Sequence, residues 1–72
     1  MQQQQTNTSN LYFDVVSVLY NSLEAAQTAA SYIQDAQSSG NSQVVQFFQQ
    51  YQQNANQQAQ QAKQMLSQLG NQ

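Results

Sequence analysis

The residues best suited to acid–base chemistry are the three carboxylates, Asp14, Glu24 and Asp35. They follow one another at intervals of ten and eleven residues, so on one continuous helix neighbouring carboxylates lie roughly 15 Å apart at 1.5 Å rise per residue. Paired carboxylate catalysis needs the two groups within about 5–10 Å. Histidine, which is the usual general base and a common zinc ligand, is absent. The sequence therefore predicts a protein that is not an enzyme.

Tyrosine is the other residue type with chemical potential, because its ring can relay electrons or stack on a ligand. The four tyrosines fall at helical spacing, which is typical of core rings whose hydroxyl groups reach water. We expect Tyr12, Tyr32 and Tyr51 in the core. Tyr20 lies off the main apolar stripe, so we expect it at a contact between subunits. This pattern predicts no cofactor and no metal.

The charge and hydropathy of the chain limit its partners and its location. Three acids and one base leave a net charge of −2, which argues against a nucleic-acid partner because phosphate binding needs clustered Lys or Arg. The most apolar run, LYFDVVSVLY, is far shorter than the roughly 20 residues that span a bilayer. The N-terminal MQQQQTNTSN lacks the features of a Sec signal. We expect no membrane span and a cytoplasmic location by default; export by another route would place the protein at the cell surface or outside the cell.

Residues 44–66, VVQFFQQYQQNANQQAQQAKQML, are rich in Gln and Asn and carry one charge, Lys63. Such a segment is either a prion-like polar tract or a helix with a neutral surface, and an apolar period decides between them. Apolar residues recur in steps of three and four in two segments, with one extra step of four between Ala55 and Ala59: Tyr12, Val16, Leu19, Leu23, Ala26, Ala30 and Ile33, then Val44, Phe48, Tyr51, Ala55, Ala59, Ala62, Leu66 and Leu69. The period favours helices, and no proline interrupts them.

Turn and capping residues divide the chain into two helices, over about residues 9–38 and 41–69. Gly40 is placed to end the first in a left-handed conformation, and Asn41 or Ser42 to cap the second. At the other end Ser9 or Asn10 is the candidate cap, with Asp14 in the first turn near the positive end of the helix dipole.

The short connection predicts an all-α, antiparallel two-helix hairpin. We expect a single domain over residues 9–72, preceded by a flexible Gln-rich tail at residues 1–8. With the turn near Gly40, facing residues have numbers that add up to about 80. Ala26 then faces Ala55, and alanines in this middle layer let the two helix axes approach closely.

A two-helix hairpin covers only one stripe of each helix, yet apolar side chains also occur off those stripes. We expect these residues to form a self-association interface: Phe13, Val15, Val18, Tyr20, Val45 and Phe47. Association would give a closed four-helix bundle or an open helical polymer. The sequence thus predicts a structural protein that assembles with itself, a homo-oligomer or filament. The alternative is a small module that binds a helix of another protein in the same place.

Residues 23–59, LEAAQTAASYIQDAQSSGNSQVVQFFQQYQQNANQQA, resemble a helical hairpin of the ferritin-like, rubrerythrin-type proteins. The shared features are alanines and Tyr32 before a glycine turn and a phenylalanine pair after it, across about half of the chain. In that family a Glu on one helix and a Glu-x-x-His pair on the next bind iron. The matching positions, near Ala25 and at residues 54–58, hold no such ligand, and Glu24 is displaced. The resemblance implies a hairpin that pairs into four helices, as a degenerate ferritin-like protein without its metal site.

Overall fold

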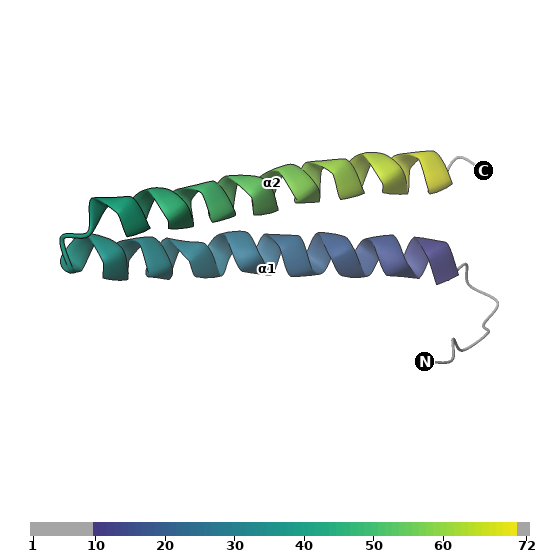
Figure 1. Ribbon diagram of the computed structural model, residues 1–72. Helices are drawn as coiled ribbons and strands as arrows, with labels where there is room; N and C mark the ends of the chain where they lie inside the picture. Colours follow the sequence, from purple (N-terminus) through teal and green to yellow (C-terminus); the bar gives the residue numbers. More distant parts are fainter. Residues whose placement is uncertain (1–9, 71–72) are drawn as a thin grey trace.

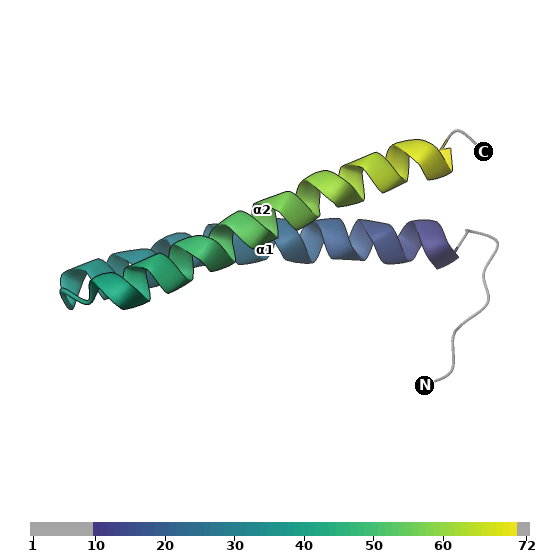
Figure 2. The ribbon, with the colours of Figure 1, turned by 45° about the horizontal axis from the view of Figure 1, so that its top comes forward.

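The computed structural model describes residues 10–70, which form two antiparallel helices of 29 residues each, α1 Asn10–Ser38 and α2 Ser42–Gly70. The two helices are joined by one short turn, and they lie closest near this turn and diverge toward their free ends (Figure 1, Figure 2). This confirms the predicted all-α hairpin, with helix ends within a residue of the expected ones. The predicted tail at residues 1–8 and the candidate cap Ser9 lie outside the described residues.

One local expectation at the start of α1 is wrong. Asp14 was expected in the first helical turn, but the first turn of α1 contains no acidic residue. Because α1 already includes Asn10, Asp14 falls just beyond the turn whose free N–H groups carry most of the positive end of the dipole.

The turn between the helices is a Schellman motif followed at once by an N-cap. Gly40 has a φ of 72°, and its N–H donates to the carbonyl of Gln37 at 3.0 Å. The Asn41 N–H donates to the carbonyl of Ala36 at 3.2 Å. The Asn41 side-chain oxygen then accepts from the N–H of Val44 at 3.1 Å. The predicted role of Gly40 is confirmed, and Asn41 is the cap of the second helix.

We expect Gly40→Ala to destabilise the hairpin by about 1 kcal/mol, because a left-handed residue with a Cβ costs about 1–2 kcal/mol. No atom lies within 4 Å of a Cβ placed there, so the cost is conformational and not steric. Urea unfolding followed by circular dichroism measures the change. Gly70→Ala is the control, since Gly70 is also open but lies in the helix; equal losses in both variants would contradict the argument.

The two helices meet along a seam of small side chains. The buried residues are Ser22, Ala26, Ala29 and Ala36 on α1, and Ala55, Ala59 and Ala62 on α2. Half-buried residues continue the same alternation of three and four residues at both ends: Val15, Leu19 and Ile33 on α1, and Val45, Phe48, Gln52, Leu66 and Leu69 on α2. A seven-residue repeat on both helices is the pattern of a left-handed antiparallel coiled coil, and α2 crosses α1 at a shallow angle (Figure 2).

On α1 the seam uses a different side of the helix from the one that the apolar period predicted. Leu19, Ala26 and Ile33 are shared, but the exposed fractions of Val16 and Leu23 are 39% and 42%. Ala30 is exposed as well, and the chain packs Val15, Ser22 and Ala29 in their place. Small residues at the contact let the helix backbones come close, whereas a row of larger side chains would hold them apart. Ser22 in place of Leu23 makes the contact smaller, and Val15 and Ala29, one heptad before and after Ser22, come onto the seam with it.

On α2 the seam differs from the predicted stripe at two positions, where Val45 and Gln52 take the places of Val44 and Tyr51, although Val44 is half-buried as well. Tyr51 was expected on the stripe, but it is 43% exposed and Gln52 is half-buried. The Gln52 side chain crosses the seam, where its Nε2 donates to the carbonyl of Ala26 at 3.0 Å. With Gln52 on the seam the repeat from Val45 onward is regular, and the extra step expected between Ala55 and Ala59 disappears. A search of the sequence for apolar periodicity leaves glutamine out, so it could not place Gln52 on the seam.

The predicted pairing of residues across the hairpin is confirmed by these contacts. The Tyr32 ring lies 5.4 Å from the ring of Phe48 and 6.4 Å from the ring of Tyr51, measured between centroids. Together with the Gln52 bond to Ala26, these pairs have numbers that add up to about 80, as a turn centred on Gly40 requires. The register of the hairpin is thereby established.

Candidate self-association surfaces

Many large apolar side chains of the described residues lie exposed, because the seam buries alanines. Those exposed are Leu11, Tyr12, Phe13, Val16, Val18, Tyr20, Leu23, Tyr32, Phe47, Tyr51 and Met65. A single exposed apolar residue is ordinary, but a cluster marks a surface that binds something. Seven of these eleven residues belong to two surfaces of the hairpin.

Four of the six predicted interface residues are exposed. The exposed fraction is 63% for Phe13, 61% for Tyr20, 68% for Phe47 and 42% for Val18. The other two, Val15 and Val45, are half-buried at seam positions, so they contribute to the packing of the hairpin itself. Tyr12, Tyr32 and Tyr51 were expected in the core, but each is about two-fifths exposed. Their rings lie at the rim of the seam because the alanine layer is too thin to cover them.

The first surface, which we call the α1 stripe, consists of Phe13, Val16, Tyr20 and Leu23. These residues follow one another in steps of three, four and three, so they share one side of α1. Beside Leu23, a hollow towards α2 is lined partly by the polar side chains of Gln27, Gln52 and Asn56. The apolar character of this side of the molecule therefore comes from α1.

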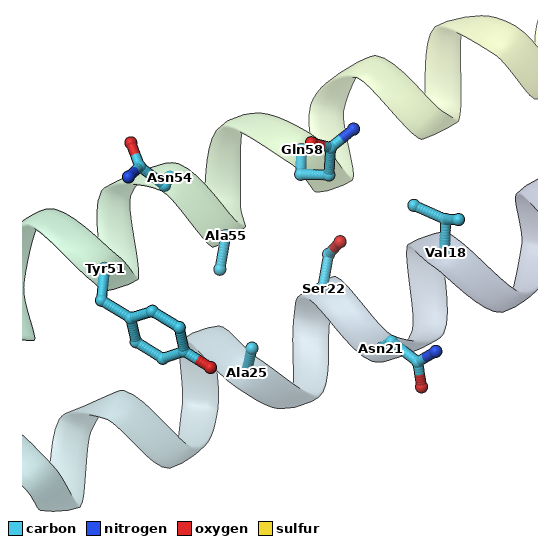
Figure 3. A pocket seen from close by; sticks show the side chains of 8 residues that line it. All are labelled: Val18, Asn21, Ser22, Ala25, Tyr51, Asn54, Ala55 and Gln58. Carbon is cyan, nitrogen blue, oxygen red and sulfur yellow. The ribbon is translucent and has the colours of Figure 1, made fainter.

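The second surface, which we call the inter-helix groove, consists of two adjoining hollows of about 350 and 450 Å³. The hollow nearer the turn is lined by Val18, Asn21, Ser22, Ala25, Tyr51, Asn54, Ala55 and Gln58. The other is lined by Val15, Val18, Gln58, Gln61, Ala62, Gln64 and Met65. In Figure 3, Ser22 and Ala55 point into the space between the helices, while Asn21 and Asn54 point away from the opposite helix. The groove thus has a small, largely apolar floor and an amide rim.

The stripe and the groove lie on opposite sides of the hairpin. At 3.6 residues per turn, Val18 and Ala25 are separated from the centre of the stripe by about half a turn around α1. The seam itself occupies the side between them. One molecule therefore presents both surfaces at once.

The groove is free of charge, and the stripe carries one carboxylate beside it, that of Glu24. No charged side chain lines either hollow of the groove. On the stripe, the Tyr20 hydroxyl donates to Glu24 Oε2 at 3.2 Å. This hydrogen bond, the negative charge of Glu24 and slight desolvation raise the pKa of Tyr20 above its ordinary value. Tyr20 is therefore neutral at physiological pH, and the surface offers apolar contact with amide and hydroxyl hydrogen bonds.

The acidic side chains of the described residues are spread along α1 and do not gather into a metal-binding cluster. Within residues 10–70, no three or more His, Cys, Asp or Glu side chains gather where they could hold a metal ion. The positions that the ferritin-like resemblance aligns with metal ligands do lie together, because Ala25, Asn54 and Gln58 line one hollow. They provide neutral amides and a methyl group, and the resemblance itself stays a prediction.

Comparison of the chain with protein-family models, curated proteins and solved structures finds no match. The class that the structure defines is therefore architectural: an all-α helical hairpin. Within the described part of the chain, neither helix combines the length and hydropathy needed to cross a membrane.

Most residues of the groove were not predicted from the sequence, including Tyr51 and Met65, which line it and are exposed. Tyr51 and Met65 could have been predicted as lining residues from the seven-residue repeat of α2. Once Gln52 is accepted at a seam position, Tyr51 and Met65 fall at positions that flank the seam on one side. The residue that hid the pattern is polar, so a search limited to apolar residues could not find it.

Proposed function

We propose that this protein is a non-enzymatic structural subunit that assembles with itself through the α1 stripe and the inter-helix groove. The observation that supports the proposal is the contrast between the seam and the surface. The seam buries six alanines and one serine, and no larger residue among those described. The aromatic rings of Phe13, Tyr20 and Phe47 are each more than three-fifths exposed. Burying a large apolar side chain contributes about 1.5–3 kcal/mol, so association recovers what folding of one chain leaves in water.

The small size of the chain also supports self-assembly. A domain of fewer than about 80 residues rarely obtains more than about 3–5 kcal/mol from its own core, and small proteins add disulfides, metals or oligomerisation. The sequence has no cysteine and no histidine, so it cannot form a disulfide and lacks the commonest ligand of structural zinc. A homo-oligomer or filament is the remaining means of stabilisation.

The low charge of the surface also supports contact between identical copies. The whole chain has four charged residues and a net charge of −2, so copies repel one another weakly. Glutamine amides can donate and accept hydrogen bonds across a contact without the desolvation penalty of an ion. The neutral, glutamine-rich surface of the protein is therefore compatible with being covered by another copy.

The groove favours a second candidate, in which the protein is a module that binds an amphipathic helix of a different protein. The two candidates differ in the behaviour of the pure protein. Self-assembly predicts a large particle without any addition, whereas an adaptor stays a monomer of 8.1 kDa until its partner is supplied. The ferritin-like interpretation differs again, since it predicts a closed dimer of four helices without bound metal.

The deciding experiment is sedimentation velocity and electron microscopy of the pure protein at micromolar concentration, with circular dichroism of the same sample. We expect particles larger than a monomer and a helical spectrum. A helical monomer would overturn the proposed function and favour the adaptor. Fibrils with a β spectrum would instead support the prion-like interpretation of the glutamine-rich segment, and a closed dimer of four helices would support the ferritin-like one.

We further expect particle size to change little between about 0.01 and 0.3 M NaCl, although the Debye length falls severalfold over that range. The reason is that neither hollow is lined by a charge, so the contact is apolar. Sedimentation velocity at several salt concentrations and constant protein concentration measures this. A steep loss of assembly at moderate salt would show that the interface depends on Asp14, Glu24, Asp35 or Lys63.

A further inference from the structure

We propose that the α1 stripe of one copy docks into the inter-helix groove of the next copy, so that assembly proceeds head to tail. The inference rests on the proposed self-assembly and adds which surface meets which. It is carried by a match between the projecting rings of the stripe and the hollows of the groove, in spacing, size and charge.

The projecting rings of the stripe are one heptad apart. Phe13 and Tyr20 are the most exposed side chains of the stripe, at 63% and 61%. Seven residues of helix place them about 10.5 Å apart at 1.5 Å per residue, on the same side of α1. They therefore form two knobs in a row parallel to the helix axis.

Residues that line the two hollows of the groove also repeat one heptad apart. On α1, Val15 and Val18 line one hollow, and Ser22 and Ala25, each seven residues further on, line the other. On α2, Ala62 lines the first of these hollows and Ala55, seven residues earlier, lines the other. The residue numbers change in the opposite direction on α2 because the helices are antiparallel. The two hollows adjoin each other, with Val18 and Gln58 lining both, and the lining residues named above repeat at about 10.5 Å along the hairpin, the spacing of the two knobs.

The sizes of the two surfaces are complementary. In the hollow nearer the turn, Ser22, Ala25 and Ala55 form a low floor beside Val18 and Tyr51 (Figure 3). In the other hollow, Ala62 lies beside Val18 and Met65. Side chains that project from one helix into gaps between small residues of two others are the packing of helical bundles. A helix that fits this groove must carry two large neutral side chains one heptad apart, and α1 of a second copy carries them.

The positions of the surfaces determine the kind of assembly. Because the stripe and the groove lie on opposite sides of the hairpin, a copy whose stripe is docked still offers its groove to another copy. A contact between two different surfaces is heterologous, and it gives a ring if the rotation closes and a filament if it does not. Contact of like surfaces, stripe with stripe or groove with groove, would instead end at a two-fold dimer.

The test is a complementation experiment with one variant on each surface. Tyr20→Lys places a charge on the stripe, and Val18→Lys places one at the point shared by both hollows. Both positions are exposed, and Glu24 and Asp14 lie four residues away to support the new lysines on the helix surface. The two charges have the same sign, so the altered surfaces do not attract each other.

We expect each variant alone to be a helical monomer and an equimolar mixture to form a 1:1 dimer, because the mixture restores one intact stripe and one intact groove. Sedimentation velocity of the separate and mixed samples at micromolar concentration measures this. Association of Val18→Lys alone would indicate stripe-to-stripe contact, and association of Tyr20→Lys alone groove-to-groove contact. Either result, or no dimer in the mixture, overturns the head-to-tail inference.

Wild-type protein in the same run separates the two levels of proposal. If the wild type is itself a monomer, the proposed function fails; if it assembles but the mixture does not pair, only the head-to-tail arrangement fails. Should either variant lose its helical spectrum, Phe13→Lys on the stripe and Met65→Lys in the groove test the same two surfaces at other exposed positions.

Discussion

Phe13→Asp is expected to turn the assembled protein into monomers while the hairpin stays helical. The Phe13 ring is 63% exposed, so its removal takes little from the isolated hairpin. In the assembly it removes about 1.5–3 kcal/mol of apolar burial, and an unpaired carboxylate in an apolar contact adds a further penalty. A loss of about 3 kcal/mol or more weakens each contact at least about 100-fold. Sedimentation velocity, with circular dichroism of the same sample, measures both outcomes.

The matched control for this variant is Gln34→Asp. Gln34 is exposed on the same helix and lies three heptads from Phe13, so it adds the same charge on the same side of α1 beyond the stripe. We expect its particles to resemble those of the wild type. If Phe13→Asp leaves particle size unchanged, the stripe is not the interface; if both variants dissociate, added negative charge and not the lost ring is the cause.

Ala29→Leu is expected to destabilise the hairpin by about 1–3 kcal/mol, the usual effect of forcing extra carbons into a packed contact. Ala29 has no exposed surface, and it lies at the seam where alanines allow the helix backbones to come close. A leucine there must push α2 away or adopt a strained rotamer. Since a protein of this size has only a few kcal/mol of stability from its core, we expect most of the folded state to be lost on mild heating.

Thermal and urea unfolding followed by circular dichroism measures this effect, at one fixed protein concentration because assembly makes the transition depend on concentration. Ala30→Leu is the control, as Ala30 is the next residue and is exposed. We expect it to change the unfolding free energy by less than about 0.5 kcal/mol. A larger loss from Ala30→Leu than from Ala29→Leu would mean that α1 packs through the side containing Val16 and Leu23.

Much of this fold was predictable because its determinants are local. A run of good helix formers without proline specifies a helix by itself, and Gly40 and Asn41 satisfy the ends of both helices through bonds within a few residues. The register of the hairpin then follows from the position of the turn. Phe13 and Tyr20 could also be recognised from the sequence as residues that the hairpin leaves exposed, because they lie off any stripe of α1 that contains the alanines.

Only the tertiary structure determined which side of α1 faces α2, and that side also determined where the groove lies. The N-terminal half of α1 is apolar on nearly every side, so its period fits more than one stripe. The choice between Leu23 and Ser22 depends on how closely two backbones can approach, which is a property of both helices together. Ala29 is then buried in preference to Ala30 because it lies one heptad after Ser22. The sequence by itself determined two helices and a turn; close packing across the alanine seam determined which apolar side chains remain on the surface.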